Sequence, residues 1–498
     1  MTRRPVYNTR MPLLRRIVFY LFLLIYLVCC PVTILYALGY VLEPGTVHGV
    51  LKTGLISLVT VPPGAAVSVG GRHYGDATPT VIRGLLPGEY GLKLALKNHR
   101  PWVRVVPVEV EKATVLEKIV LLPDRPAPRE VLAGPFTDLV PIPGTRFILL
   151  VKGRSLEDIV VYDREADDGW ALIPAASAFL GGQIAWHLML RDSPFLLFKV
   201  AFPAGIKFLG IELIKGRARL TDLSSLFMSQ PQRVMWDARA AHQLFSLHDY
   251  TVDRLDTDGM ALYPQVATQV RGMGVHDGML YLVQDGGALQ RMDPDGKHAE
   301  ALTADPAADH VLAEARGPLQ ITGLASNLVI VVSDEGELFL NRVPYRFVAA
   351  GVRGFEFDPE HDRVVVWLRD RLGVLDLSTV SGKDAALAQA LRVRWAFQGG
   401  SNIAQAFWAY DGSHILFRDG ATVLLLEEET YGPPACNELL RVKEGTSIAY
   451  AEQTGQLHYI DSRSGSLNVL EIIPGKESRF LRRPANAMDN RHKAKADR

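Results

Sequence analysis

The pattern of apolar and polar residues divides the 498-residue chain into three parts, of which the first is an uninterrupted apolar run. Residues 17–40 include no charged side chain. A helix of that length rises about 36 Å, and the hydrocarbon core of a bilayer is about 30 Å thick. The pattern therefore predicts a single transmembrane helix over residues 17–40, with the lipid bilayer as its partner.

Charges on either side of this run predict its orientation. The first acidic residue, Glu43, follows the run, whereas five arginines precede it: Arg3, Arg4, Arg10, Arg15 and Arg16. Positive flanks stay on the cytoplasmic side, so we expect residues 1–16 to be a cytoplasmic tail. The remaining domains would then be extracytoplasmic, in the periplasm of a cell with an inner membrane. A cleaved signal peptide is the alternative, but its apolar region is usually only about 7–15 residues long.

The second part, residues 54–123, alternates short β-branched stretches with turn residues. Leu55 to Val61 and Ala66 to Gly71 read as strands separated by a Pro-Pro-Gly turn. A second turn at Pro87-Gly88 precedes a stretch in which every other residue is apolar. This pattern predicts a small antiparallel β-sandwich without a helix.

The turns and strands of residues 54–123 resemble the PEGA family. The matching positions are Pro63, Gly64, Ala65, Val67, Val69, Gly71, Gly75, Thr78, Pro79, Leu86, Pro87, Gly88, Tyr90, Leu92 and Leu94. The family often has a Gly-Tyr step after the last strand, and this chain has residues 98–102, NHRPW, in that place. The resemblance implies a binding or spacer module of the cell envelope, without catalytic residues.

The third part, residues 134–474, repeats a strand–turn–strand–turn–strand unit about every 35–50 residues. Such tandem repetition is typical of a β-propeller. The span favours seven blades, with eight as the alternative and another all-β array, such as two sandwiches, as the competing fold. A proline-rich linker is expected at residues 124–133, and a basic, disordered tail at residues 475–498.

Composition narrows the function classes. The formal net charge is zero, so no overall field favours nucleic acid as a partner. The chain has three cysteines, and Cys29 and Cys30 lie inside the apolar run, which leaves no set for a disulfide framework or zinc cluster.

Several residues are candidates for chemistry, and each has a simpler explanation. His242 and His248, with Asp249, have no third metal ligand at a suitable spacing. The Asp-x-Asp-Gly pieces at residues 256–259 and 293–296 lack the acids of a calcium loop and fit hairpin turns. Cys436 has no base nearby in sequence. Six tryptophans in the third part suggest blade packing: Trp170, Trp186, Trp236, Trp367, Trp395 and Trp408.

We therefore expect no catalytic, cofactor-binding or metal-ligating residue, and no cofactor. The sequence favours a non-enzymatic scaffold or binding protein of the bacterial envelope, with an envelope protein or polysaccharide as partner. Two alternatives remain: a glycan lyase or hydrolase with its site on the propeller funnel, and the sensor domain of a membrane complex. The enzyme alternative requires carboxylates, or a metal centre, that converge on the funnel.

Overall fold

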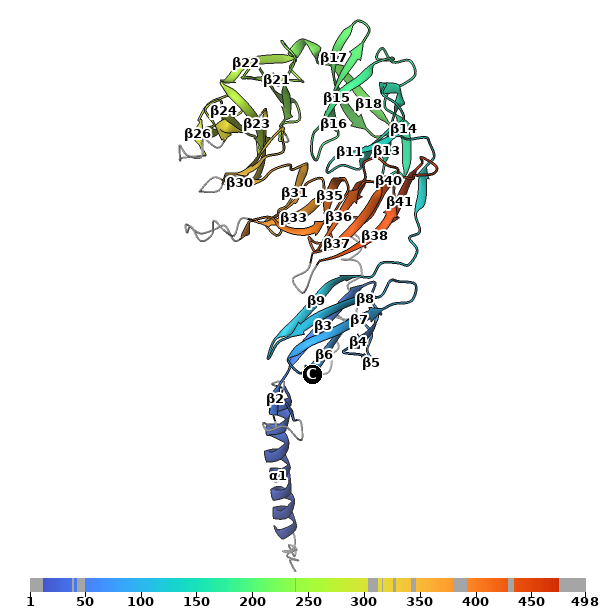
Figure 1. The fold of residues 1–498 in the computed structure, drawn as a ribbon, viewed down its shortest axis with the longest axis vertical. Coiled ribbons are helices and arrows are strands. Elements are labelled where there is room, and N and C mark those ends of the chain that lie inside the picture. Colours follow the sequence, from blue (N-terminus) through green and yellow to red (C-terminus); the bar gives the residue numbers. More distant parts are fainter. Residues whose placement is uncertain are drawn as a thin grey trace, which may run out of the picture. The chain divides into compact units, whose positions relative to one another are not determined.

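The computed structural model divides into two compact units, which we describe separately (Figure 1). Unit 1 comprises Met1–Arg125 with Thr430–Gly432, and unit 2 comprises Pro126–Glu429 with Pro433–Arg498. The structure describes residues 12–37, 40–42, 50–237, 239–302, 312–315, 317–325, 328–341, 346–378, 392–428 and 434–473. The predicted tail at residues 475–498 lies outside the described residues, as do residues 1–11 of the predicted cytoplasmic segment.

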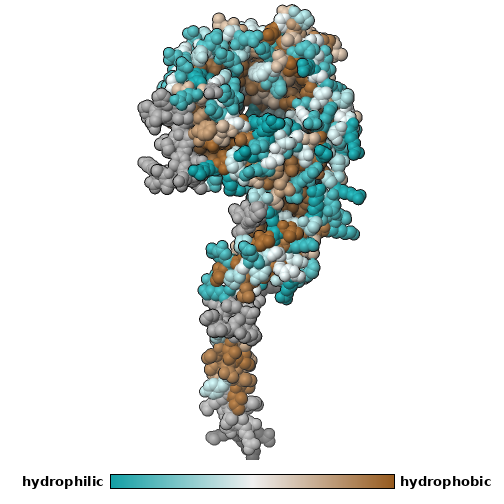
Figure 2. All heavy atoms as spheres, viewed as in Figure 1, coloured by the Kyte–Doolittle hydropathy of each residue, from teal (hydrophilic) through white to brown (hydrophobic). Residues whose placement is uncertain are grey.

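Unit 1 begins with one helix, α1 (Pro12–Ala37), and a short strand pair. The apolar side chains of α1 from Ile17 to Val28 are exposed; Phe22 exposes 70% of its surface and Tyr26 exposes 69%. Figure 2 shows this stretch as a mostly hydrophobic surface. Within the described residues, no helix reaches the length and apolarity that crossing a membrane would require. The predicted range 17–40 also differs from the helix, because Tyr40 lies in β1 (Tyr40–Leu42), which pairs with β2 (Val50–Lys52).

The rest of unit 1 is a β-sandwich of two sheets. One sheet has the order β6-β3-β9 and the other β5-β4-β7-β8. The strands are β3 (Gly54–Val61), β4 (Ala66–Val69), β5 (Arg72–Tyr74), β6 (Thr80–Leu85), β7 (Gly88–Ala95), β8 (Trp102–Val108) and β9 (Ala113–Val120). Every other residue of β3 is buried, as the alternating pattern predicts. The expectation of a wholly antiparallel sandwich is wrong, because β3 and β9 pair in parallel.

The Pro-Pro-Gly turn of the sandwich is fixed by Thr78. Its hydroxyl accepts a hydrogen bond from Ala65 N at 3.0 Å and lies 2.5 Å from Thr60 Oγ1. Its carbonyl accepts a hydrogen bond from Gly64 N at 2.7 Å. Gly64 has φ +93°, a conformation that is open to glycine at little cost. The turn residues therefore shape the hairpin and satisfy one another.

Unit 2 consists of successive four-stranded antiparallel sheets, which we number as blades. Blade 1 contains β11 (Asp138–Pro141), β12 (Phe147–Val151), β13 (Ile159–Asp163) and β14 (Asp168–Ala171), and blade 2 contains β15 (Gln183–Met189), β16 (Phe195–Phe202), β17 (Gly205–Ile214) and β18 (Arg217–Asp222). Blade 3 contains β19 (Arg233–Trp236), β20 (Gln243–His248), β21 (Thr251–Asp256) and β22 (Ala261–Thr268). Blade 4 contains β23 (Val270–His276), β24 (Met279–Gln284), β25 (Leu289–Met292) and β26 (Glu300–Ala301). One short 3₁₀ turn, η1 (Leu156–Asp158), lies between β12 and β13 of blade 1, and another, η2 (Ser224–Leu226), follows β18 at the end of blade 2.

Blades 5 to 7 repeat the same strand order. Blade 5 contains β27 (Leu319–Ala325), β28 (Leu328–Ser333), β29 (Leu338–Leu340) and β30 (Arg346–Ala349). Blade 6 contains β31 (Gly354–Asp358), β32 (Arg363–Trp367), β33 (Arg371–Asp376) and β34 (Arg394–Gln398). Blade 7 contains β35 (Ile403–Ala409), β36 (His414–Asp419), β37 (Thr422–Glu427) and β38 (Ala435–Arg441). Blades 4 and 5 join into one eight-stranded sheet, since β23 and β27 pair in parallel.

Blade 8 closes the ring by combining strands from both ends of unit 2. It contains β39 (Ala449–Ala451), β40 (Gln456–Ile460) and β41 (Leu467–Glu471), and β10 (Arg129–Leu132) pairs with β41 as the outermost strand. The predicted linker at residues 124–133 thus contains a blade strand, and the described residues form eight blades rather than the favoured seven. The blade strands range from two to ten residues in length, so the repeat is irregular in the sequence, which explains the undercount.

Buried side chains connect neighbouring blades in ring order. Separate apolar clusters join blades 1 and 2, 2 and 3, 3 and 4, 4 and 5, 5 and 6, and 6 and 7. A further cluster packs Phe136 and Tyr162 against Ile460 and Leu467, which joins blades 8 and 1. This succession is the packing of an all-β propeller, in which each sheet buries both faces against its neighbours.

Candidate functional site

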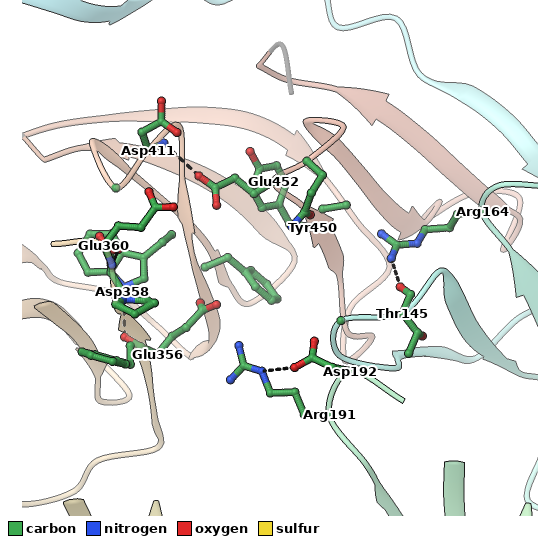
Figure 3. A pocket seen from close by; sticks show the side chains of 18 residues that line it. Thr145, Arg164, Arg191, Asp192, Glu356, Asp358, Glu360, Asp411, Tyr450 and Glu452 are labelled. Carbon is green, nitrogen blue, oxygen red and sulfur yellow. Dashed lines mark hydrogen bonds and ion pairs between the residues drawn. The ribbon is translucent and has the colours of Figure 1, made fainter. Parts of the chain in front are cut away.

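A cavity of about 420 Å³ lies within unit 2, at one end of the first, or inner, strands of blades 6, 7, 8, 1 and 2, which are β31, β35, β39, β11 and β15. We call it the ring pocket (Figure 3). Its walls combine the ends of β31, β35 and β39 with the turns that follow these strands and the turns that follow β11, β13 and β15. The lining residues are Gly144, Thr145, Arg164, Arg191, Asp192, Glu356, Phe357, Asp358, Pro359, Glu360, Phe407, Trp408, Asp411, Gly412, Tyr450, Ala451, Glu452 and Gln453.

Charges in the ring pocket are unevenly distributed. Blades 6, 7 and 8 supply five carboxylates: Glu356, Asp358, Glu360, Asp411 and Glu452. Blades 1 and 2 supply both guanidinium groups, Arg164 and Arg191, together with the carboxylate of Asp192. Carboxylates therefore outnumber guanidinium groups, six to two, and the excess of negative charge lies on the side of blades 6 to 8.

Glu356 is the most unusual of these carboxylates. It lies in β31, and its Oε2 exposes less than 1 Å² and has no hydrogen-bond partner in the described part of the chain. Burial raises the pKa of Glu356 to about 7, against the opposing effects of a backbone hydrogen bond from Trp408 and the charge of Arg191. The nearby charges of Glu452 and Asp358 raise the pKa further. Figure 3 shows this carboxylate pointing into the pocket.

Asp358, in contrast, is fully occupied by its own blade. Its Oδ1 accepts a hydrogen bond from Glu360 N at 3.1 Å, and its Oδ2 lies 2.8 Å from His361 Nδ1 and 3.2 Å from Arg363 Nη2. Arg363 continues the network to Glu428 Oε2 at 2.8 Å. Asp358 therefore holds the turn that follows β31.

Trp408 and Glu452 fix the adjoining walls. Trp408 Nε1 donates a hydrogen bond to the carbonyl of Glu356 at 3.1 Å, so blade 7 holds the backbone that carries the buried carboxylate. Asp411 N donates to Glu452 Oε1 at 3.0 Å, which connects the turns of blades 7 and 8. The acidic side of the pocket is thus built by hydrogen bonds between three blades.

The two arginines differ in availability. Arg164 donates to the carbonyls of Thr145 and Arg146, and burial lowers its pKa. Arg191 has a side chain that is 76% exposed, and its Nε lies 3.9 Å from Asp192 Oδ2. Figure 3 shows Arg191 across the cavity from Glu356, with no hydrogen bond or ion pair drawn between the two.

The candidate residues from the sequence do not come together into a site in the structure. His242 precedes β20 and His248 ends it; His248 Nε2 lies 2.8 Å from Asp253 Oδ2. Asp256 accepts hydrogen bonds from the backbone of Asp258 and Gly259, as a hairpin turn requires. Among the residues that the structure describes, no group of His, Cys, Asp and Glu could hold a metal ion.

Cys436 and five of the six tryptophans lie outside the ring pocket. Burial raises the pKa of the Cys436 thiol to about 12, so it stays protonated near neutral pH. Of the six tryptophans, only Trp408 lines the ring pocket. Sequence reasoning missed Glu356, although a glutamate between Phe355 and Phe357 in a blade strand was a usable signal.

Comparisons with known proteins give one family match and several distant structural likenesses. Residues 53–121 match the PEGA domain. No curated protein matches the chain. The chain has distant likenesses among solved structures: the computationally designed Ika8 protein (11% identity, TM-score 0.44, 69% of this chain and 100% of that one) and the β-propeller domain of Cps50 (Swd1) from Myceliophteria thermophila (12%, 0.35, 60% and 98%).

A third likeness is to PorZ of Porphyromonas gingivalis, described as an essential bacterial surface component of the type-IX secretion system (11% identity, TM-score 0.35, 66% of this chain and 42% of that one). Likenesses this distant carry no argument about function. Residues 53–121, the β-sandwich of unit 1, are thus the segment with a matching family, and that family is PEGA.

Proposed function

We propose that this protein is a non-enzymatic binding protein of the bacterial envelope. Residues 17–40 hold it in the cytoplasmic membrane by a single pass, with the N-terminus in the cytoplasm. The PEGA unit and the propeller lie outside the cytoplasm, and the propeller binds an envelope partner at the ring pocket.

Two features support the anchor. Residues 17–40 lack charge, and α1 (Pro12–Ala37) covers most of them. The apolar side chains of α1 from Ile17 to Val28 expose between 45% and 70% of their surface, which is costly in water and favourable in lipid. Protease added outside the cytoplasmic membrane should digest the propeller, and protection of the propeller would overturn this orientation.

The ring pocket is the observation that carries the binding role. Turns from five blades converge there, and propellers can present such a surface because their inner strands meet around one axis. A buried carboxylate oxygen without a hydrogen-bond partner in the described residues, as at Glu356 Oε2, is unfavourable in the free protein. A bound partner that donates a hydrogen bond to this oxygen would remove that unfavourable contribution in the complex.

Affinity capture with the full chain tests this role. Solubilised envelopes would be passed over wild type, Glu356→Gln and Asp285→Asn, the last of which removes one charge from an exposed turn of blade 4. We expect a partner that wild type and Asp285→Asn retain and that Glu356→Gln or a pocket-filling variant, Thr145→Trp, loses. Retention of every captured protein by both pocket variants would refute the role of the pocket.

A glycan hydrolase is the second candidate, and the converging carboxylates favour it. A carboxyl group with a pKa near 7 suits a general acid, and other carboxylates line the same cavity. Hydrolysis of envelope glycan by the full chain, abolished in Glu356→Gln, would replace the binding role with this one.

A further inference from the structure

The ring pocket has the composition of a receptor for a cationic group. Its carboxylates outnumber its guanidinium groups six to two, and one of those guanidinium groups, Arg164, already donates to backbone carbonyls. An anionic ligand would face this excess of negative charge in a partly enclosed space, where repulsion is poorly screened. The pocket therefore selects for positive charge.

Glu356 marks where that charge would sit. Its Oε2 is buried and has no hydrogen-bond partner in the described residues, and its carboxylate points into the cavity. The described part of the fold supplies no donor to this oxygen, and a group that enters the cavity can supply one. An ammonium or guanidinium group supplies both the donor and the compensating charge.

The size and rim of the pocket indicate a side chain rather than a bare ion. A cavity of about 420 Å³ holds a group of several carbon atoms, and aromatic residues such as Phe407, Trp408 and Tyr450 can pack against a methylene stem. Asp192, Glu360 and Gln453 at the rim are exposed, so an extended side chain can enter from solvent.

We propose that the ring pocket binds one lysine or arginine side chain of a partner protein, with Glu356 as its counter-ion. This inference rests on the proposed binding function and adds the chemistry that the partner must present. Arg191 lies opposite Glu356 and repels the incoming cation, which restricts the cation to the side of blades 6 to 8.

The test uses the full chain in detergent and two probe peptides, acetyl-Ala-Ala-Lys-Ala-Ala-amide and the same peptide with its lysine acetylated on Nζ. Ligand-observed NMR would give the affinity of each. We expect acetylation to weaken binding at least tenfold, because it removes the charge and keeps the stem. Equal affinity for the two peptides, or no binding of the lysine peptide, would overturn the proposal.

Variants locate the cation. Glu356→Gln should weaken the lysine peptide at least tenfold, Glu356→Asp should weaken it less, and Asp285→Asn should change it less than twofold. An unchanged affinity in Glu356→Gln, with a near-ultraviolet circular dichroism spectrum like that of wild type, would refute the role of Glu356.

The capture experiment separates the two levels of this account. If Thr145→Trp abolishes capture of a partner but the lysine peptide does not bind to wild type, the pocket binds a group of another chemical class and only this inference fails. If neither pocket variant affects capture, the proposed function fails as well.

Discussion

Replacing Glu356 by glutamine should stabilise the propeller at alkaline pH, although it removes a residue of the proposed binding site. Burial raises the pKa of Glu356 from 4.5 to about 7, so the folded state binds a proton that the unfolded state releases. Stability from this group is fully present below pH 4.5 and is lost as the pH rises through about 7.

The magnitude follows from the shift. A pKa difference of about 2.5 units corresponds to about 3 kcal/mol at pH 8, which is an upper value because glutamine also has to be buried there. For a unit of this size, about 3 kcal/mol raises the melting temperature by about 4 °C. At pH 4 the two proteins should melt together, because the carboxyl group is then protonated in both states.

Differential scanning fluorimetry of the full chain at pH 4, 6 and 8 would measure this difference. Asp285→Asn is the matched control, since Asp285 lies on an exposed turn and its replacement should leave the melting temperature unchanged. A variant Glu356→Gln that melts below wild type at pH 8, or that gains equally at pH 4 and pH 8, would refute the reasoning.

The remaining predictions concern the other buried groups and the closure of the ring. Burial and the charge of Arg164 lower the pKa of His458 from 6.5 to about 3, so stability is full above about pH 6.5 and is lost as the pH falls. At pH 4.5 the loss should be about 3 kcal/mol, and His458→Phe should melt with a weaker acid dependence than wild type; an unchanged dependence would contradict this. Glu130 and Asn468 lie opposite each other in β10 and β41, so Glu130→Cys with Asn468→Cys should form a disulfide on oxidation, detected by mass spectrometry, whereas Glu130→Cys with Asp285→Cys should not. Failure of the first pair to link would count against closure by β10. Leu94→Ala should destabilise the sandwich by about 2–5 kcal/mol in urea unfolding, because Leu94 is fully buried between its sheets, and a loss below about 1 kcal/mol would show that the core is misassigned.

The sandwich could be predicted from sequence because its determinants are local. Pro63, Gly64, Pro87 and Gly88 specify turns, and the alternation of apolar residues around them specifies which face is buried. The parallel pairing of β3 with β9 could not be read in the same way, since it joins residues that are more than 50 positions apart.

The propeller fold could be predicted from the sequence, but the number of its blades could not. Repeated strands and turns indicate blades, whereas the blade that closes the ring depends on Arg129–Leu132 pairing with Leu467–Glu471 from the other end of the unit. Four residues after a proline-rich stretch carry no periodicity that would distinguish a strand from a linker.

The ring pocket could not be predicted from the spacing of residues along the sequence. Thr145, Arg191, Glu356, Asp411 and Glu452 are separated by tens to hundreds of residues and meet because five blades place their turns at one end of the ring. Only Glu356 carried a local signal, as an acid between two phenylalanines of a strand, and that signal indicates burial without showing its purpose.

Photocrosslinking in living cells tests most directly whether the ring pocket is the surface that binds a partner. A photoreactive amino acid would replace Gln453, an exposed residue of the pocket rim, or Asp285, on the exposed β24–β25 turn of blade 4. The account predicts a discrete crosslinked species from position 453 that disappears when Glu356→Gln is added, and none from position 285. A crosslink from position 453 that survives Glu356→Gln together with Thr145→Trp, or no crosslink from position 453 at all, would contradict it.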